Sequence, residues 1–259
     1  MSAYQNTPFD LSGRTALVTG GGRGLGKEMA RLLAKAGADV AICSRTEDQL
    51  RATAAELGAE TGRRVEAIVA DVGQRAGTEQ LAKDSIERMG KVDILVSNAG
   101  WNIPQPATGI QDADWDKLLE LNVTSSMVLT RALAPGMMER KWGRIIYISS
   151  IMALASTADR VAYSTTKAAL HGMVKANCLH LGPHGITVNC IAPGPFATEM
   201  PMSILSQAQK DSFASRTALG RWGEPPELAP TALLLASDAG RYLTGGIVVV
   251  DGGVTARMW

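Results

Sequence analysis

Short apolar runs alternate along the chain with longer segments whose apolar residues recur at helical spacing. Seven runs predict buried strands, over residues 14–18, 39–43, 64–69, 92–97, 143–149, 186–191 and 247–250. Six segments predict helices, over residues 27–34, 47–60, 78–89, 114–138, 162–181 and 225–236. Strands joined by helical crossovers form a parallel sheet, so we expect an α/β fold with a doubly wound, seven-stranded sheet and helices on both faces.

Nothing in the pattern divides the chain into parts. No Ser/Pro-rich linker and no block of like charges interrupts it, so we expect residues 1–259 to form a single domain after an N-terminal extension of residues 1–10. Residues 193–223 carry Pro, Met and Ser without a clean strand. We expect this piece to be irregular, with residues 195–223 forming the substrate-loop region.

A glycine-rich turn joins the first predicted strand to the first predicted helix. It reads Thr19-Gly20-Gly21-Gly22-Arg23-Gly24-Leu25-Gly26. Backbone N–H groups at such a turn and at a helix N-terminus bind phosphate, and glycine lets the backbone approach a ligand closely. The turn matches neither the G-x-G-x-x-G fingerprint nor a P-loop, because residues 25 and 27 are Leu and Lys and no Gly-Lys-Ser/Thr follows. A nucleotide site is still a better interpretation than a plain turn, because a strand and a helix flank it.

Tyr163 and Lys167 are four residues apart on a predicted helix, so they share one face at a separation of roughly 6 Å. A phenol has a pKa of about 10, and a neighbouring ammonium favours the phenolate and lowers that pKa toward neutral pH. Such a pair alone is more often an amphipathic helix surface. In a chain that also carries the glycine turn, the Tyr163–Lys167 pair predicts a catalytic pair in which Tyr163 exchanges a proton with the substrate.

The two motifs, in this order, resemble the short-chain dehydrogenase/reductase family in its single-domain branch. The resemblance implies a Rossmann-type fold in which residues 1–259 bind a dinucleotide and carry the catalytic groups. It implies that Ser150, thirteen residues before Tyr163, polarises the substrate carbonyl, whereas Ser149 merely ends a strand. It also implies that Asn122 holds a water that links Lys167 to solvent.

The same resemblance places further cofactor contacts just after strand ends. Asn98 is expected to tie adjacent strands together beside the cofactor, and Thr198 to bond the nicotinamide end. Asp71 resembles an adenine contact, although a cap on the next helix explains it equally well. The expected cofactor-binding set is Gly20, Gly22, Arg23, Gly24, Leu25, Gly26, Ser44, Arg45, Asp71, Val72, Asn98, Ala99, Gly100, Tyr163, Lys167, Pro193, Gly194 and Thr198.

The end of the second predicted strand indicates which cofactor is bound. An NAD site places an acid there to accept from the ribose 2′-OH, but Asp39 lies at the opposite, amino end of this strand. The carboxyl end reads Cys43-Ser44-Arg45, and Arg45 and Arg23 can both pair with a 2′-phosphate. We therefore expect NADP(H). In the alternative, both arginines are solvated, and Glu47 or Asp48 serves the ribose of NAD.

Composition narrows the class of protein further. With 20% charged residues and a net charge of +1, nothing indicates a partner that is nucleic acid or a membrane surface. Residues 1–8 lack the apolar region of a secretory signal, and no apolar run reaches membrane-spanning length. The three cysteines, Cys43, Cys178 and Cys190, are widely spaced and predict reduced thiols, no metal site and a cytoplasmic protein.

The sequence says least about the substrate. We expect hydride transfer between nicotinamide and a carbonyl or secondary alcohol. Residues 192–200 and 220–223 resemble gluconate 5-dehydrogenase-like members, which favours a sugar acid or polyol, and the chain is also similar to 3-oxoacyl-carrier-protein reductases. Arg160 and Arg257 are the cations available to a sugar acid, though a subunit interface explains either equally well. The residues expected to wall the pocket are Trp101, Met152, Leu154 and Phe196.

Three alternatives stay open. One is a 3-oxoacyl thioester reductase, one a non-catalytic nucleotide-binding regulator on the same fold, and one a nucleotide-sugar epimerase or dehydratase of the extended branch. Little chain follows Gly253, which argues against the last of these. Family members of this size form homotetramers, and we expect residues 114–138 and 162–181 at one interface, with Met258 and Trp259 packed against a partner.

Overall fold

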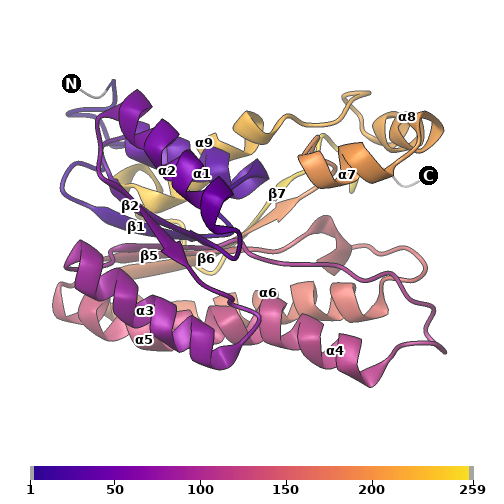
Figure 1. Cartoon of the computed structure of the whole chain (residues 1–259), viewed down its shortest axis with the longest axis horizontal. Helices are drawn as coiled ribbons and strands as arrows, with labels where there is room; N and C mark the ends of the chain where they lie inside the picture. Colours follow the sequence, from indigo (N-terminus) through magenta and orange to yellow (C-terminus); the bar gives the residue numbers. More distant parts are fainter. Residues whose placement is uncertain (1–2, 257–259) are drawn as a thin grey trace.

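The computed structural model describes residues 3–256 of the chain, so Arg257, Met258 and Trp259 lie outside the described residues. The strands form one parallel sheet of seven, in the order β3-β2-β1-β4-β5-β6-β7 (Figure 1). The seven predicted strands and the α/β fold are confirmed. The strands are β1 (Thr15–Thr19), β2 (Asp39–Ser44), β3 (Val65–Val69), β4 (Ile94–Ser97), β5 (Gly143–Ile148), β6 (Ile186–Pro193) and β7 (Ile247–Val250).

Helices cover both faces of this sheet, with α1, α2 and α9 on one side and α3 to α6 on the other (Figure 1). The α-helices are α1 (Gly24–Lys35), α2 (Glu47–Thr61), α3 (Arg75–Met89), α4 (Asp112–Leu119), α5 (Ser125–Glu139), α6 (Val161–Leu181), α7 (Glu199–Ile204), α8 (Gln207–Arg216) and α9 (Pro225–Ala236). In the part of the chain that the structure describes, no helix is both long and apolar enough to cross a membrane.

The alternation of side chains along each strand fills two cores. In β1, Ala16 and Val18 join the cluster under α1, α2 and α9, whereas Leu17 joins the cluster under α3, α5 and α6. All three side chains are fully buried. This explains why the strands are continuous apolar runs, because a parallel sheet covered on both faces has no polar side.

Two regions differ from the prediction. The helix expected over 114–138 is divided by a π-helical turn, Glu120–Thr124, which separates α4 from α5. The region expected to be irregular between 193 and 223 contains the short helices α7 and α8. Ser206 and Gln209 form a capping box at the start of α8, which fixes where that helix begins.

The sheet order places the functional residues. β1 lies between β2 and β4, so the direction of winding reverses beside β1, and ligands of doubly wound sheets bind at the carboxyl ends of the strands at such a point. The glycine turn follows β1, Arg45 follows β2, Asp71 lies just beyond β3, and Asn98 follows β4. All four segments therefore meet at one edge of the sheet.

Candidate active site

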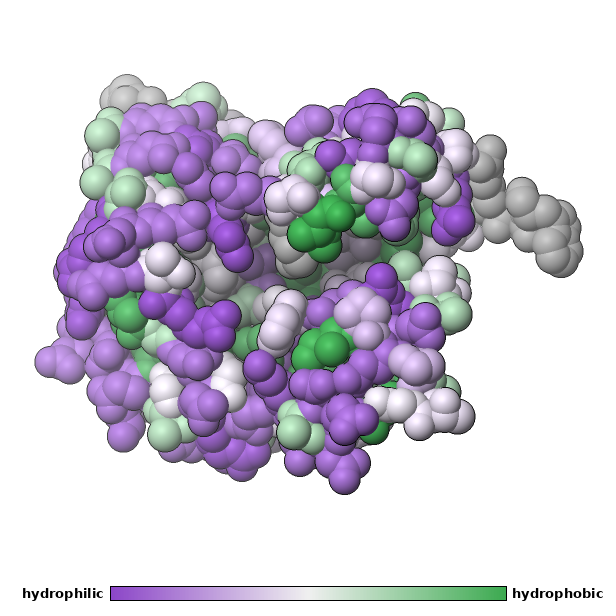
Figure 2. All heavy atoms as spheres, turned by 45° about the vertical axis from the view of Figure 1, so that its right-hand side comes forward, coloured by the Kyte–Doolittle hydropathy of each residue, from purple (hydrophilic) through white to green (hydrophobic). Residues whose placement is uncertain are grey.

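A cleft of about 1000 Å³ opens at this edge. A space-filling view shows this side of the molecule hollowed between an upper and a lower half (Figure 2). The predicted residues that line the cleft are Gly20, Gly22, Arg23, Gly24, Leu25, Gly26, Ser44, Arg45, Asp71, Val72, Asn98, Ala99, Gly100 and Thr198. The structure thus brings together most of the expected cofactor-binding set.

The glycine turn keeps its shape because larger residues would not fit. Gly20 has φ +65°, a left-handed conformation that favours glycine, and it lies where the chain leaves β1. A Cβ on Gly26 would lie 2.6 Å from Asn98 Nδ2 and would collide with the backbone of Gly20. The turn therefore delivers the N-terminus of α1, with its free N–H groups, to the cleft.

Asn98 ties β4 to β1 beside the turn. Its Nδ2 donates to the carbonyl oxygen of Thr19 at 2.8 Å, and its backbone N–H donates to Thr19 Oγ1 at 2.9 Å. The N–H of Ala99 donates to the same hydroxyl at 2.9 Å. These bonds hold the two strand ends at a fixed spacing, which agrees with the expectation that Asn98 is a tie between strands.

Two cations face the cleft from separate loops. Arg45 is exposed at the end of β2, beside Ser44. Arg23 is the N-cap residue of α1. Its Nη1 lies 3.5 Å from Oε2 of Glu199, which also lines the cleft. Asp39 lies at the amino end of β2, where it accepts from Arg63 at 2.6 Å. Asp39 is therefore remote from the cleft, as its position in the strand predicts.

Asp71 lies at the cleft and also organises the turn before α3. Its Oδ1 accepts from the backbone N–H of Gly73 at 3.0 Å. Asp71 does not cap α3, whose N-cap residue is Gln74, and its expected contact with adenine stays a prediction.

Ser150 and Tyr163 lie together just beyond the end of β5. Ser150 Oγ accepts from the N–H of Met152 at 3.1 Å, which fixes the hydroxyl at the start of a short 3₁₀ turn. Tyr163 lies in the first turn of α6, where the Ser150 hydroxyl is close enough to lower the pKa of the Tyr163 phenol. Ser149 instead donates to the carbonyl oxygen of Lys167 at 3.0 Å and bonds His171 Nε2 at 2.9 Å, so it fastens β5 to α6. The two serines therefore have separate roles.

Lys167 is buried beneath this pair. Its Nζ donates to the carbonyl oxygen of Ile148 at 2.8 Å and lies 5.7 Å from the centre of the Tyr163 ring. Burial lowers the pKa of the Lys167 ammonium to about 8. A Cβ on Gly100 would approach both Lys167 Nζ and Asn122 Oδ1 at 3.1 Å, so Gly100 leaves the room through which Lys167 reaches the cleft.

The pKa of Tyr163 does not fall toward neutral pH as the neighbouring Lys167 led us to expect. Burial raises the pKa of Tyr163, and the Ser150 hydroxyl and the charge of Arg160 oppose this rise only in part. The physical reason is that the phenol is buried, and the loss of water disfavours its charged form.

Asn122 lies in the π-helical turn, and such turns are frequent at functional sites. Its Oδ1 accepts from the N–H of Trp101 at 2.9 Å, and its Nδ2 donates to the carbonyl oxygen of Trp101 at 2.9 Å and to Thr166 Oγ1 at 3.0 Å. The side-chain amide is thus bound to protein groups, and the expected holding of a water by the backbone carbonyl and side chain of Asn122 stays a prediction. Asn122 fixes the loop that begins at Trp101.

The expected pocket residues divide into two groups. Trp101 lines the cleft, with Lys117 Nζ 4.5 Å from the centre of its ring, and Met152 and Leu154 follow Ser150 at the surface. Phe196 does not wall a pocket, because it is 7% exposed and belongs to the core. It packs on Gly223, where an added Cβ would lie 2.7 Å from its ring.

Pro193 and Gly194 end β6 away from the lining of the cleft. Gly194 packs against Asp251, because a Cβ there would lie 2.6 Å from Asp251 Cα. These two residues shape the turn that leads toward Thr198. Only Thr198 of this group reaches the cleft, where it faces Gly24.

Comparison with known proteins agrees with this arrangement. A family model described as enoyl-(acyl carrier protein) reductase matches residues 20–255. Gluconate 5-dehydrogenase of Gluconobacter oxydans is 36% identical over 253 residues, 96% of this chain and 98% of the relative. A 3-oxoacyl-[acyl-carrier-protein] reductase of Aquifex aeolicus is 32% identical over 244 residues, 94% of this chain and 98% of the relative.

The chain belongs to the short-chain dehydrogenase/reductase family. Its fold is also that of a solved member, the gluconate 5-dehydrogenase from Burkholderia cenocepacia J2315 in complex with NADP and tartrate. That structure superposes with a TM-score of 0.91 at 35% identity and covers 97% of this chain and 98% of that chain. The predicted family and its Rossmann-type fold are confirmed.

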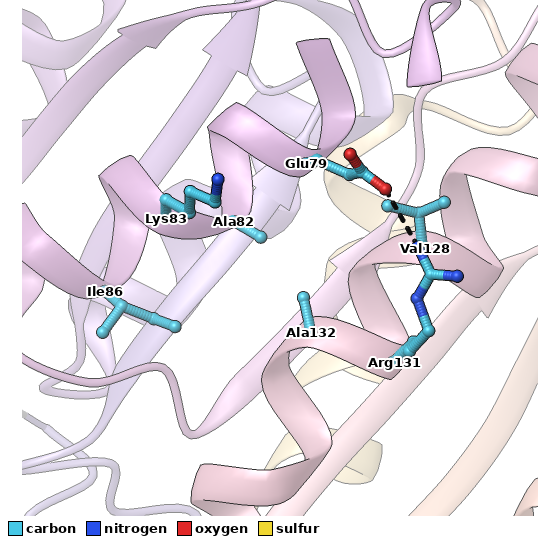
Figure 3. Close-up of a pocket in the computed structure, with 7 residues that line it drawn as sticks. All are labelled: Glu79, Ala82, Lys83, Ile86, Val128, Arg131 and Ala132. Carbon is cyan, nitrogen blue, oxygen red and sulfur yellow. Dashed lines mark hydrogen bonds and ion pairs between the residues drawn. The ribbon is translucent and has the colours of Figure 1, made fainter. Parts of the chain in front are cut away.

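A second cavity of this short-chain dehydrogenase/reductase lies between α3 and α5 and has a volume of about 260 Å³ (Figure 3). Arg131 of α5 donates to Glu79 of α3 at 3.0 Å beside it. The cavity shares no lining residue with the cofactor cleft. Within residues 3–256, no group of His, Cys, Asp and Glu side chains is arranged to hold a metal ion.

Two residues at this short-chain dehydrogenase/reductase site, Glu199 and Lys117, were not predicted from the sequence. Glu199, the residue after Thr198, lies opposite Arg23, and Lys117 covers Trp101. Glu199 lies within the stretch 192–200 that resembles gluconate 5-dehydrogenase-like members, but nothing there gave it a role, and Lys117 belongs to no motif. The Arg23–Glu199 and Trp101–Lys117 contacts join different elements of the chain, so the sequence does not reveal them. The one available signal is that Glu199 directly follows Thr198.

Proposed function

We propose that this protein is an NADP(H)-dependent oxidoreductase that transfers a hydride between nicotinamide and a carbonyl or secondary alcohol. The observation that carries the proposal is that Ser150 and Tyr163 lie together, with Lys167 buried beneath them and Gly100 between that lysine and the cleft. A mere nucleotide-binding regulator has no need of this arrangement. The activity itself is inferred from the geometry and the family.

The residues of the cleft fit a dinucleotide. The N-terminus of α1 and the glycine turn supply N–H groups for a diphosphate, and Asp71 offers a carboxylate oxygen for an adenine amine. Arg23 and Arg45 are guanidinium groups at the end where a 2′-phosphate would lie, and no acid follows β2 directly. This donor set supports NADP(H) over NAD(H).

The chain's own groups handle the proton. When bound, the nicotinamide supplies or accepts the hydride. Because burial raises its pKa, the Tyr163 hydroxyl is protonated at neutral pH and can donate to the oxygen of a carbonyl that is being reduced. Ser150 donates to the same oxygen and stabilises the charge that develops there. Lys167 reaches toward the ribose hydroxyls past Gly100, and in the oxidative direction Tyr163 takes the proton back.

For the substrate we favour a sugar acid or polyol, by analogy with the two gluconate 5-dehydrogenases. A 3-oxoacyl thioester remains the second candidate, because Trp101 at the cleft and Leu154 just after Ser150 present apolar surface, 41% and 49% exposed. The Aquifex aeolicus relative also favours this second candidate.

We further propose that the protein is a cytoplasmic homotetramer. Cys43 and Cys190 are buried free thiols, and Cys178 is a partly buried one, which suits a reducing compartment. Leu179 of α6 is 78% exposed and would be covered by a helix of a second subunit. Light scattering at micromolar concentration tests this association, and a monomer there contradicts it.

The activity is tested by following NADPH oxidation with a panel of 2,3-butanedione, keto sugar acids, ketoses and 3-oxoacyl thioesters. The proposal predicts turnover with at least one carbonyl, and the class of the best substrate decides between the two candidates. No turnover with any carbonyl, and no reduction of NADP⁺ by the matching alcohols, would leave the regulator as the better account.

A further inference from the structure

Three side chains of α6 lie on one face of the helix, each one turn after the last. They are Tyr163, Lys167 and His171, and the first two serve the proposed reaction. The ring of His171 is half-buried, and burial together with the charge of Lys175 lowers its pKa. The imidazole is therefore uncharged at neutral pH, with one nitrogen that donates and one that accepts.

The partner of this ring is the Ser149 hydroxyl, directly after β5. Ser149 Oγ lies 2.9 Å from His171 Nε2 and 3.0 Å from the carbonyl oxygen of Lys167. A carbonyl oxygen can only accept, and a hydroxyl has a single proton, so Ser149 donates that proton to Lys167. His171 Nε2 is then the donor to Ser149, and the neutral ring carries its proton on Nε2.

The chain at the end of β5 is fastened to two neighbouring elements. The carbonyl oxygen of Ile148 accepts from Lys167 Nζ at 2.8 Å, and the N–H of Ser149 donates to the carbonyl oxygen of Ile191 in β6 at 2.8 Å. Ser150 follows directly. The place of its hydroxyl therefore depends on how these two preceding residues are held.

This placement matters because the reacting groups come from two elements. Ser150 follows β5, whereas Tyr163 and Lys167 belong to α6. A displacement of about 1 Å between groups that act together can cost on the order of 100-fold in rate. Lys167 is one tie between the two elements, and the reaction also uses it. A second tie is the Ser149–His171 bond, whose members both lie outside the lining of the cofactor cleft.

We propose that His171 is a positioning residue of the reaction. Its Nε2–H holds Ser149 against α6 and thereby sets the Ser150 hydroxyl beside Tyr163. The inference rests on the proposed oxidoreductase function and adds a residue to the groups that serve it. Because His171 acts through Ser149, its loss should slow hydride transfer and leave cofactor binding unchanged. A ring that merely fills space could be replaced by an apolar side chain of similar size without such a loss.

The test is the single-turnover rate of NADPH oxidation with the best carbonyl of the panel at saturation. His171→Leu keeps most of the volume and removes the donor, so the rate should fall about three- to tenfold, as for one neutral hydrogen bond. The Kd for NADPH should stay within about twofold. His171→Gln should restore the rate, because its Nε2 lies the same number of bonds from Cα as the imidazole Nε2. His171→Asn is shorter and should not.

A double-variant cycle separates the bond from packing. Ser149→Ala should slow the reaction to a similar extent, and adding His171→Leu to Ser149→Ala should have little further effect, because the partner is gone. His184→Leu, at the amino end of β6, is the matched control and should change neither the rate nor the Kd. A wild-type rate in His171→Leu, no rescue by His171→Gln, or additive losses in the double variant overturn the inference while the function stands.

A spectroscopic measurement covers the case in which no carbonyl is turned over. With ¹⁵N-labelled histidine, magnetic resonance shows which nitrogen of His171 carries the proton, and His171→Leu assigns its signals among the three histidines of the chain. At pH 7.5 the ring should be neutral with its proton on Nε2, and Ser149→Ala should speed the exchange of that proton with water. A proton on Nδ1, or an exchange rate that Ser149→Ala leaves unchanged, contradicts the positioning bond independently of any activity.

Discussion

Arg23 Nη1 lies 3.5 Å from Glu199 Oε2, so the glycine turn and the first residue of α7 form an ion pair at the cofactor cleft. Both side chains are more than half exposed, and such pairs contribute only about 0–1 kcal/mol. A 2′-phosphate that approaches Arg23 must compete with the Glu199 carboxylate for the same guanidinium. The pair therefore opposes the binding of NADP(H) and has less effect on NAD(H).

Replacing Glu199 with Gln should tighten NADPH binding. The expected gain is about two- to fivefold in Kd, because the competing charge is removed, and the Kd for NADH should stay unchanged. Fluorescence titration of both cofactors measures this. In an Arg23→Ala background the same Glu199→Gln change should have no effect, since the partner is gone. An equal gain for NADH in the wild-type background would show that Glu199 acts in another way.

The choice of NADP over NAD depends on two arginines. The double variant Arg23→Ala/Arg45→Ala should raise the KM for NADPH by about tenfold or more and leave the KM for NADH within about threefold, because charge-assisted bonds to the 2′-phosphate are lost. Arg64→Ala, an exposed arginine beside the amino end of β3, is the matched control and should change neither value. Equal losses for both cofactors would contradict the assignment.

Much of this site could be predicted because its residues follow strand ends. The glycine turn, Ser44 and Arg45, Asp71 and Asn98 each lie at or just beyond the end of a predicted strand, and parallel strands bring their carboxyl ends together. The order of residues alone also predicts that Asp39 lies at the amino end of β2, away from the cofactor cleft. Such inferences need only the strand pattern and the direction of the chain.

The parts that could not be predicted depend on contacts between distant elements. No residue in 114–138 signals the π-helical turn that aims Asn122 at Trp101. Phe196 was expected to wall a pocket, but its neighbour Gly223, which leaves room for the ring, is 27 residues further along. The raised pKa of Tyr163 likewise depends on how much water the fold excludes, and spacing along a helix does not report that.

Burial of Lys167 should reduce the stability of the fold. Its pKa is about 8 in the folded protein against an ordinary value of 10.5, so below pH 8 the folded state holds a charged ammonium away from water. This difference corresponds to a penalty of on the order of 3 kcal/mol. Lys167→Met should therefore lose turnover and yet raise the free energy of unfolding at pH 7 by on the order of 1–3 kcal/mol.

The pH dependence gives the sign of the effect. Between about pH 8 and 10.5 the unfolded chain keeps the Lys167 proton and the folded chain releases it, so the contribution of this group to stability rises with pH. The stability difference between Lys167→Met and the wild type should be largest below pH 8 and shrink toward pH 10. Chemical denaturation at pH 7 and pH 9.5 measures both values. A gap that is constant or grows with pH would contradict the burial argument.

The central claim is that Tyr163 exchanges the proton with the substrate. Tyr163 lies beside the cofactor cleft but outside its lining, so Tyr163→Phe should keep the Kd for NADPH within about twofold. Ser149→Ala, which alters the neighbouring hydroxyl that fastens β5 to α6, serves as the control and should lose far less activity than Ser150→Ala.

The most direct measurement is the turnover number of Tyr163→Phe on the best substrate, at saturating NADPH and neutral pH. The account predicts a loss of about 10²- to 10⁴-fold, the range expected when a positioned proton donor is removed. Turnover near the wild-type rate, with NADPH bound as tightly as before, would contradict it.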